Sequence, residues 1–499
     1  MQNKKVLLVS EATYLNSGYS NYGYQIMKML YDTKDFDLAE ISCHGNHDRS
    51  HEIPWKSYVV PENSNIFGKD IFNDVLIDFK PDIVWSFRDP WVDDFICDSV
   101  LRNHFKWVYM PTIDSLPLDI DWIDTINRSD AVLTYTDWAA EELKNLCPNM
   151  NIFGSASPGF DFNFIPVEDK IKFKIKHGIN GDALIIGSVM RNQKRKLIPD
   201  LFDAFCELIE KADSYLSERL FLYLHTTYPD VGWNIPRLLS ERPKISNKVL
   251  FSYNCSVCSK LSISSFSGAI LQCNNCKNIS CTFPRVTKGS KRDDMSMVYN
   301  LMDLYVQYSC AEGFGMPIVE AASCGVPICA VDYSAMKDIV KKLEGFPIKV
   351  QRYTYEVETN RKFALPDNSD FVNTCIEFFK KPIPIRNILS KKTRKLVEHN
   401  FNYKNTFEKI KNLFSLLPFS ESWKKEAKYI KVPDILNKDI SNEEFIQNIF
   451  DKIPIDFGNL KEKCLFKLNY KFYSKEKIYE ELKTVFNNYN YYESLRENA

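Results

Sequence analysis

The sequence has little glycine, no long apolar run and almost no net charge. No apolar segment reaches the roughly 18–20 residues that a membrane helix needs, and the apolar block 6–9 is typical of a buried first strand. A formal charge of −1 excludes the uniformly basic surface of proteins that coat nucleic acid or an anionic membrane. We therefore expect a cytoplasmic protein without a transmembrane segment, in which any polyanion site is local.

Apolar residues make up 44% of the chain and aromatic residues 14%, which is enough for large cores and excludes wholesale disorder. At roughly 150 residues per domain, 499 residues predict about three folding units. Strand-like blocks such as 5–10, 131–135 and 183–189 alternate with helical patterns such as 137–146 and 197–212. This alternation predicts βα units around parallel sheets, an α/β fold.

The strand and helix pattern is interrupted at three places. Prolines and mixed charges interrupt it near residue 168, and a Ser-, Asn- and Lys-rich stretch with cysteines interrupts it again later. After residue 417 the sequence is charged and aromatic with helical patterns only. We predict a first α/β domain, a second α/β domain, an insertion within it and a helical C-terminal extension, over residues 1–168, 169–417, 252–290 and 418–499.

A glycine-rich turn between two glutamates is the most informative segment of the chain. Glu312 precedes the turn, Gly313 and Gly315 form it, and Glu320 lies in the helix that Pro317 helps to start. The glycines let a ligand approach bare backbone, and the first N–H groups of the helix suit an anion such as a diphosphate. One carboxylate would then bind a sugar hydroxyl and the other a ribose. The alternative is an ordinary helix start with an exposed glutamate.

This segment resembles the motif of two glutamates separated by seven residues in retaining glycosyltransferases of the GT-B fold, the family 4-like "glycosyl transferases group 1". Residues 187–196 resemble the family's strand followed by an Arg and, five positions later, a Lys, here Arg191 and Lys196. Two cations beyond a strand end can neutralise a leaving diphosphate. Lys194 and Arg195 obscure the register. The resemblance assigns seven residues to the donor: Gly18, Arg191, Lys196, Gly313, Phe314, Gly315 and Glu320.

The resemblance implies two Rossmann-like domains that face each other across a cleft. It also implies transfer of a sugar from a UDP-, GDP- or ADP-sugar with retained anomeric configuration, by a front-face mechanism without an obligatory catalytic metal. In that mechanism Glu312 holds the donor sugar. The acceptor would be a glycan, a lipid-linked sugar or a modified nucleobase. We weigh this against an inactive GT-B scaffold that binds a protein or nucleic-acid partner.

The acceptor side departs from the family pattern. Many relatives have a His near the reacting sugar, whereas the corresponding strand end here leads to Asp114. Asp114 takes that catalytic place or merely caps a turn, and the sequence leaves both interpretations open. Arg88 and Asp89 are further candidates, because ligands of parallel sheets gather beyond the carboxyl ends of strands.

Two Cys-x-x-Cys pairs predict a metal site within the insertion. Fourteen residues separate Cys255 and Cys258 from Cys273 and Cys276, a spacing typical of zinc ribbons. Four thiolates close the tetrahedral shell of zinc, so we expect a structural ion remote from the chemistry. Free cysteines in a loop are the alternative, and Cys281 is a spare. Basic residues after the second pair make nucleic-acid contact possible but not favoured, since no aromatic row accompanies them.

Overall fold

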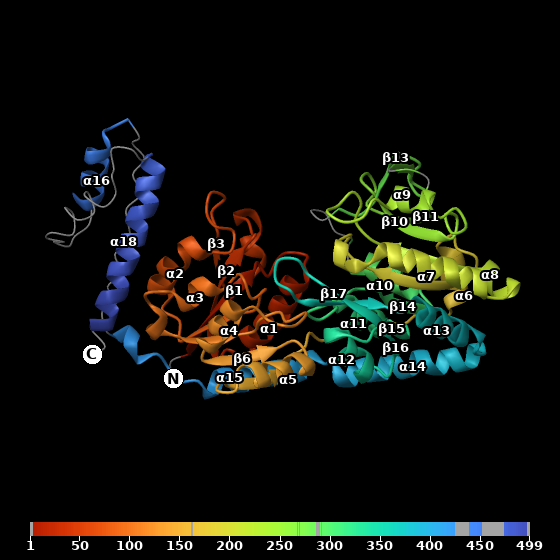
Figure 1. Cartoon of the computed structure of the whole chain (residues 1–499), viewed down its shortest axis with the longest axis horizontal. Coiled ribbons are helices and arrows are strands. Elements are labelled where there is room, and N and C mark those ends of the chain that lie inside the picture. The colour runs from red at the N-terminus through yellow and green to blue at the C-terminus, as the bar shows by residue number, and fades with distance from the viewer. Residues whose placement is uncertain are drawn as a thin grey trace.

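The computed structural model describes residues 3–160, 163–266, 268, 270–285, 290, 292–424, 439–451 and 474–496. Two α/β domains, each built around one sheet, lie side by side along the long axis of the molecule (Figure 1). The predicted α/β fold class is confirmed. Within the described residues, no helix is long and apolar enough to cross a membrane.

A seven-stranded parallel sheet forms the first domain, in the order β3-β2-β1-β4-β5-β6-β7. Its central strands are nearly continuous apolar runs, because helices cover both faces of the sheet. The strands are β1 (Lys4–Glu11), β2 (Phe36–Cys43), β3 (Lys56–Val59), β4 (Ile83–Ser86), β5 (Lys106–Tyr109), β6 (Ala131–Thr134) and β7 (Ile152–Ser155). The helices are α1 (Gly18–Thr33), α2 (Phe72–Phe79), α3 (Asp94–Cys97), α4 (Ile120–Asn127) and α5 (Asp137–Leu146).

The second domain has a sheet in the order β12-β13-β10-β9-β8-β14-β15-β16, of which the run from β10 to β16 is parallel. The strands are β8 (Leu184–Val189), β9 (Leu220–His225), β10 (Val249–Cys255), β11 (Leu261–Ser265), β12 (Ile270–Gln272), β13 (Ile279–Thr282), β14 (Leu304–Gln307), β15 (Ile328–Val331) and β16 (Phe346–Ile348). A separate hairpin pairs β17 (Val350–Tyr355) with β18 (Lys362–Pro366).

Helices cover the second sheet and connect it to the rest of the chain. They are α6 (Lys170–Lys176), α7 (Ile198–Lys211), α8 (Ser214–Arg219), α9 (Ile235–Ser240), α10 (Arg292–Asn300), α11 (Met316–Ser323), α12 (Ser334–Lys342), α13 (Asn368–Lys380), α14 (Ile383–Asn400) and α15 (Tyr403–Leu416). Helix α10 ends at Asn300, and β14 begins at Leu304, directly after Asp303. The reason is Asp303, whose N–H donates to the Ile185 carbonyl and whose carboxylate accepts from the Ile185 N–H, so that the chain joins the sheet.

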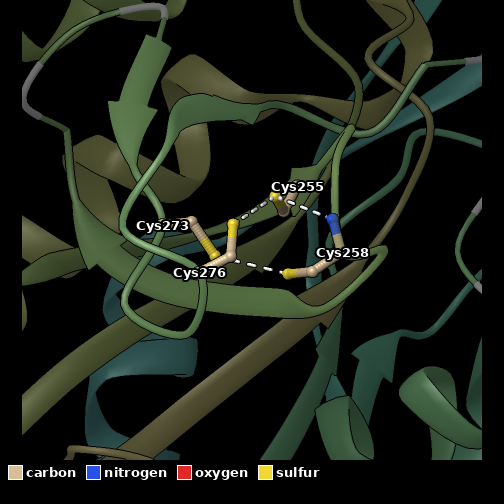
Figure 2. A group of neighbouring side chains, drawn as sticks. All are labelled: Cys255, Cys258, Cys273 and Cys276. Carbon is tan, nitrogen blue, oxygen red and sulfur yellow. Dashed lines mark hydrogen bonds between the residues drawn. The ribbon is translucent and has the colours of Figure 1, made fainter.

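The cysteine-bearing insertion is less separate than we expected. Its first strand, β10, is a strand of the main sheet that pairs in parallel with β9 and antiparallel with β11 and β13. Cys255, Cys273 and Cys281 belong to the same apolar core as the strands and helices on one face of that sheet. Figure 2 shows the four predicted metal ligands pointing toward one another beyond the end of β10.

The last helix before the C-terminal extension returns to the first domain. Phe414 of α15 is fully buried, with its ring 5.7 Å from Trp85 and 6.3 Å from Phe36. Lys4 Nζ donates to the carbonyl of Phe414 at 2.8 Å. The boundaries proposed from the sequence, at 168 and 417, stay predictions, but residues 403–416 contribute to the core of the first domain.

The described part of the C-terminal extension is helical, as predicted. It consists of α16 (Asn442–Asp451) and α18 (Lys475–Arg496), in which Phe450 and Phe486 are buried against each other with ring centroids 5.4 Å apart.

We predict that Phe414→Ala lowers the free energy of unfolding by about 3–5 kcal/mol, because the substitution leaves a cavity between aromatic rings of the first domain. Leu416→Ala, two residues away at a side chain that is 73% exposed, should change it by less than about 0.5 kcal/mol. Urea unfolding followed by tryptophan fluorescence measures both. Equal effects of the two substitutions would contradict the packing of α15 on the first sheet.

Candidate functional site

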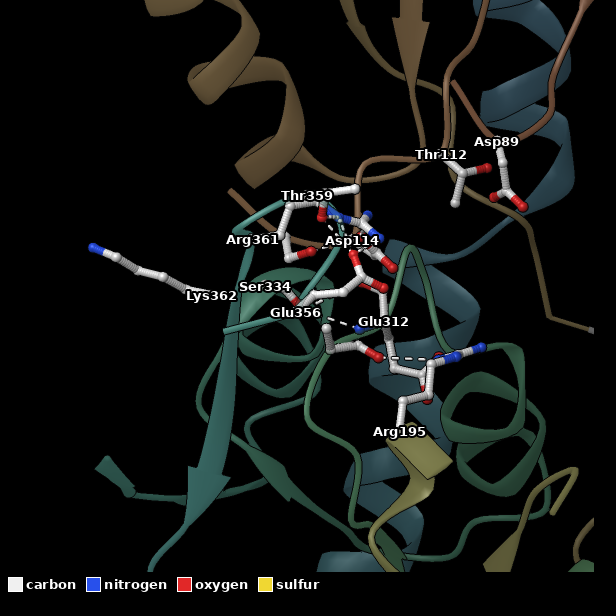
Figure 3. A network of polar contacts seen from close by, with 12 residues as sticks. Asp89, Thr112, Asp114, Arg195, Glu312, Ser334, Glu356, Thr359, Arg361 and Lys362 are labelled. Atoms are coloured by element: carbon white, nitrogen blue, oxygen red, sulfur yellow. Dashed lines mark hydrogen bonds and ion pairs between the residues drawn. The ribbon is translucent and has the colours of Figure 1, made fainter. Parts of the chain in front are cut away.

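Glu312 is the centre of a buried ionic cluster. It follows β14 in the turn before α11 and is only 5% exposed. Arg195 Nη1 donates to its Oε2 at 2.8 Å, Lys196 Nζ pairs with its Oε1, and Gln307 Nε2 donates to Oε1 at 2.7 Å. Figure 3 shows Arg195 and Glu312 facing each other at the end of the second sheet. The carboxylate thus accepts charged hydrogen bonds on both oxygens.

Burial raises the pKa of Glu312, but the charges of Arg195 and Lys196 outweigh it and hold this pKa well below its usual range. The same carboxylate raises the pKa of Arg195. Burial lowers the pKa of Lys196, although Glu312 acts in the opposite direction. Glu312 is therefore an anion at neutral pH, and the cations Arg195 and Lys196 lie beside it.

The structure gives the two predicted diphosphate cations different partners. Lys196 is buried against Glu312, whereas Arg191 is half exposed and makes a two-point ion pair with Asp230, at 3.0 and 3.1 Å. Arg195 lies at the Glu312 carboxylate, although our sequence analysis assigned it no role. Lys194, Arg195 and Lys196 are consecutive basic residues, and sequence alone does not show which of them point toward Glu312.

The glycine turn of the second domain lies directly against the first domain. A Cβ added to Gly313 would come within 2.2 Å of Thr112 Cγ2, and a Cβ on Gly18 would lie 3.7 Å from Met316 Cγ. The Phe314 ring is buried near Tyr135 and Phe401 rather than exposed to a ligand. The two glycine segments predicted from sequence therefore meet at the domain boundary.

Gly315 caps the start of α11 and has a φ of +100°, a conformation that other residues rarely adopt. The first turn of α11 leads to Glu320, whose Oε2 accepts a hydrogen bond of 2.5 Å from the hydroxyl of the fully buried Tyr299. Tyr299 belongs to α10. The second glutamate of the motif is thus held by a neighbouring helix and not by the cations that hold Glu312.

Asp114 joins the two domains. Arg361, at the end of the hairpin turn just before β18, donates to Asp114 Oδ1 at 2.6 Å and to Glu356 at 2.8 Å, as Figure 3 shows. The backbone N–H of Lys362 also donates to the Leu116 carbonyl, at 2.8 Å. Asp114 therefore lies at the boundary as an ion-pair partner, and its predicted catalytic role is untested.

The other two acceptor-side candidates, Arg88 and Asp89, lie in different surroundings. Arg88 is buried in an ion pair with Asp93 inside the first domain. Asp89 instead faces the boundary, where its carboxylate accepts from the Tyr19 hydroxyl at 3.0 Å. The same hydroxyl lies 2.7 Å from Thr112 Oγ1. Burial raises the pKa of Asp89, and Asp114 adds to this effect, while Tyr19 opposes it.

The four predicted cysteine ligands come together. Their sulfur atoms all lie within 4.8 Å of one another, and the Sγ distances from Cys255 to Cys276 and from Cys258 to Cys273 are 3.6 Å (Figure 2). Four thiol groups at this separation fit one tetrahedral metal ion. Cys281 lies outside the cluster, as predicted, and burial raises the pKa of its thiol to about 12. The four cysteines could therefore hold one metal ion.

Comparisons with known proteins agree with this architecture. Residues 284–359, which include both glutamates, match the family "Glycosyl transferases group 1". No curated protein is significantly similar in sequence.

Solved structures share the fold at low sequence identity. Sucrose-phosphate synthase from Thermosynechococcus elongatus is 14% identical, with a TM-score of 0.59 over 83% of this chain and 99% of that chain. Anabaena Alr3699/HepE, solved in complex with UDP and glucose, is 14% identical, with a TM-score of 0.56 over 83% and 100%. A glycosyltransferase from Rickettsia africae is 13% identical, with a TM-score of 0.57 over 84% and 99%. The family match and the shared fold confirm the predicted resemblance to GT-B glycosyltransferases.

We predict that Glu312→Gln destabilises the protein in a pH-dependent way. A carboxyl group whose folded-state pKa is lowered stabilises the protein above its unfolded-state pKa, about 4.3, and loses that contribution as the pH falls further. At neutral pH the substitution should cost about 3 kcal/mol, because it leaves buried cations unpaired. The cost should shrink as the pH falls below about 4. Thermal unfolding between neutral and acidic pH measures it.

The exposed Glu62 provides the matched control, since Glu62→Gln changes a solvated carboxylate. A constant difference between the wild type and Glu312→Gln at all pH values would show that the charge of Glu312 is not what stabilises the cluster.

Proposed function

We propose that this protein is a glycosyltransferase that moves a sugar from a nucleotide-sugar donor to an acceptor hydroxyl with retention of the anomeric configuration. The observation that carries the proposal is the pair of glutamates at one glycine turn, with Glu312 held by the partly exposed Arg195 and the buried Lys196, and Glu320 held by Tyr299. The pair lies within the segment that matches the glycosyltransferase family. Two carboxylates with separate partners suit the two ends of one donor.

We assign the donor to the domain boundary. Gly18 and the turn 313–315 approach each other there, so that a diphosphate would meet bare backbone and the start of α11. HepE, a structural neighbour, was solved with UDP and with UDP-glucose. We therefore rank a UDP-sugar first among the UDP-, GDP- and ADP-sugars. Incubation with each nucleotide sugar, followed by hydrolysis and thermal-shift measurements, tests the donor class.

The chemical step that we propose needs no protein nucleophile. The bond between the anomeric carbon and the diphosphate oxygen breaks, the bond to the acceptor oxygen forms on the same face, and the acceptor proton passes to the departing diphosphate. Arg191 and Lys196 stabilise the charge that develops on that diphosphate. Lys196 must then share its charge between Glu312 and the phosphate, and Arg195 remains to hold the Glu312 carboxylate.

The acceptor side is assigned to the first domain. Asp89, fixed by Tyr19 beside Thr112, and Asp114, paired with Arg361, are two carboxylates that face the boundary from that side. The cytoplasmic location and the identity of the acceptor stay predictions from sequence. The rival function, an inactive scaffold, predicts no hydrolysis of any nucleotide sugar.

We further propose that the metal bound by the four cysteines is zinc. An all-sulfur tetrahedral set is typical of structural zinc, and it leaves no coordination position for water or substrate. The ion would supply folding energy to the two Cys-x-x-Cys turns at the end of β10.

The two glutamates should differ in their effects on binding. Glu320→Gln should weaken the binding of UDP about tenfold or more, since one charged hydrogen bond contributes about 1.5–3 kcal/mol. Glu312→Gln should leave UDP affinity nearly unchanged and slow hydrolysis of the UDP-sugar, because Glu312 is assigned to the sugar. Calorimetry with UDP, done below the unfolding temperature of each variant, separates them. If only Glu312→Gln lost UDP affinity, the two roles would be exchanged.

Cys273→Ser should abolish the metal. Elemental analysis should find one zinc per wild-type chain and none in the variant, and limited proteolysis should increase between residues 252 and 290, because a structural zinc contributes on the order of 10 kcal/mol to folding. Cys206→Ser, a half-buried cysteine in α7, is the control and should retain the zinc. Recovery of iron in place of zinc would refute the metal assignment.

A further inference from the structure

The metal site lies at the same edge of the sheet as the donor residues. Cys255 is the last residue of β10, which runs parallel to β9, β8 and β14. Arg191 lies just beyond the end of β8, and Glu312 lies beyond the end of β14. The register places Phe251 of β10 beside Leu224 of β9, which pairs with Ser188 of β8, so Cys255 lies two strands from β8 and four residues further along. The cysteine-bearing turns therefore leave the sheet at the edge that carries Arg191 and Glu312, while the expected remoteness of the ion from the chemistry stays a prediction.

One set of contacts connects the ribbon to Arg191. Phe283, directly after β13, is 2% exposed, and its ring lies 4.7 Å from Tyr253 of β10 and 5.6 Å from Tyr228. Tyr228 belongs to the loop after β9 that also carries Asp230, the partner of Arg191. The packing of Phe283 thus supports the loop that sets the position of the Arg191 guanidinium.

Hydrogen bonds make a second connection across the same strand ends. Ser252 Oγ of β10 lies 2.9 Å from His225 Nδ1 and 2.7 Å from the Tyr223 hydroxyl, all three groups being buried. The carbonyl of His225 in turn accepts from the N–H of Met190, the residue before Arg191. A displacement of β10 would therefore be transmitted to the end of β8.

The chain that leaves the ribbon forms the other half of the donor site. It enters α10, which begins at Arg292 and carries Tyr299. Tyr299 is fully buried and donates to Glu320 at 2.5 Å. Asn300, the next residue, accepts from the N–H of Val167 and donates to the Ile165 carbonyl. Before the start of α10, Ser290 Oγ accepts from Asn254 Nδ2 of β10 at 3.2 Å, and the end of α10 is tied to the connection between the domains.

We propose that the metal-bound ribbon positions the donor-binding residues, so that the metal controls affinity for the nucleotide. The metal holds the end of β10 and the ribbon segment that leads toward α10. The first of these segments positions Arg191 through Asp230, and the second positions Glu320 through Tyr299. Tyr299 is accordingly a positioning residue for Glu320. The proposal rests on the donor roles given above to Arg191 and Glu320.

The test compares nucleotide affinity with and without the metal. Cys276→Ser removes a half-buried ligand, and Cys281→Ser changes a neighbouring cysteine outside the cluster. Calorimetry with UDP, GDP and ADP identifies the nucleotide that binds the wild type best, and elemental analysis gives the metal content of each protein. We expect Cys276→Ser to lose the metal and to bind that nucleotide at least tenfold more weakly, whereas Cys281→Ser matches the wild type in both measurements.

Tyr299→Phe provides a second test that leaves the metal centre intact. It removes only the hydroxyl that holds Glu320, so we expect full metal content, an unchanged unfolding temperature within a few degrees and about fivefold weaker nucleotide binding. This variant keeps the proposal testable if Cys276→Ser does not fold.

The outcomes are distinct. A metal-free Cys276→Ser that binds the nucleotide as tightly as the wild type overturns the positioning role and leaves the proposed function in place. A Tyr299→Phe that binds the nucleotide as tightly as the wild type overturns the part of the proposal that runs through α10. A wild-type protein that binds none of the three nucleotides overturns the proposed function itself, and with it the role of the ribbon.

Discussion

The buried carboxylate of Glu312 is the interaction on which the site depends. A carboxylate out of water is stable only with compensating charge and hydrogen bonds, and here Arg195, Lys196 and Gln307 supply them. These partners come from the turn after β8 and from the end of β14, so the ion cluster fixes two loops of the second domain at once. Because the cations exceed the anion by one charge, the cluster leaves a net positive charge where we place a diphosphate.

The domain boundary is built from two kinds of contact. Aromatic packing of Phe314 with Tyr135 and Phe401 makes one continuous apolar cluster across both domains. The ion pair between Asp114 and Arg361 and the adjacent backbone hydrogen bond are polar and more exposed. Polar contacts of this kind can exchange with water at modest cost, whereas apolar packing cannot. Any opening of the domains would therefore break the Asp114 side first.

Much of this architecture was predictable from sequence, and the exceptions share one cause. Apolar runs predicted β1 and β8, helical patterns predicted α5 and α7, and residue type with spacing predicted the cysteine cluster and the two glutamates. Arg195, Tyr299 and Arg361 were missed because their importance comes from partners 21 to 247 positions away, Glu312, Glu320 and Asp114.

The return of α15 to the first sheet affects how the chain folds during synthesis. The sheet of the first domain is complete at Ser155, but Phe414 is needed to cover Trp85 and Phe36. At about 5–20 residues per second, the ribosome needs tens of seconds at the slow end of that range to reach α15. An apolar surface of the first domain stays exposed over that interval, which makes nascent chains of this protein natural clients of chaperones that bind such surfaces.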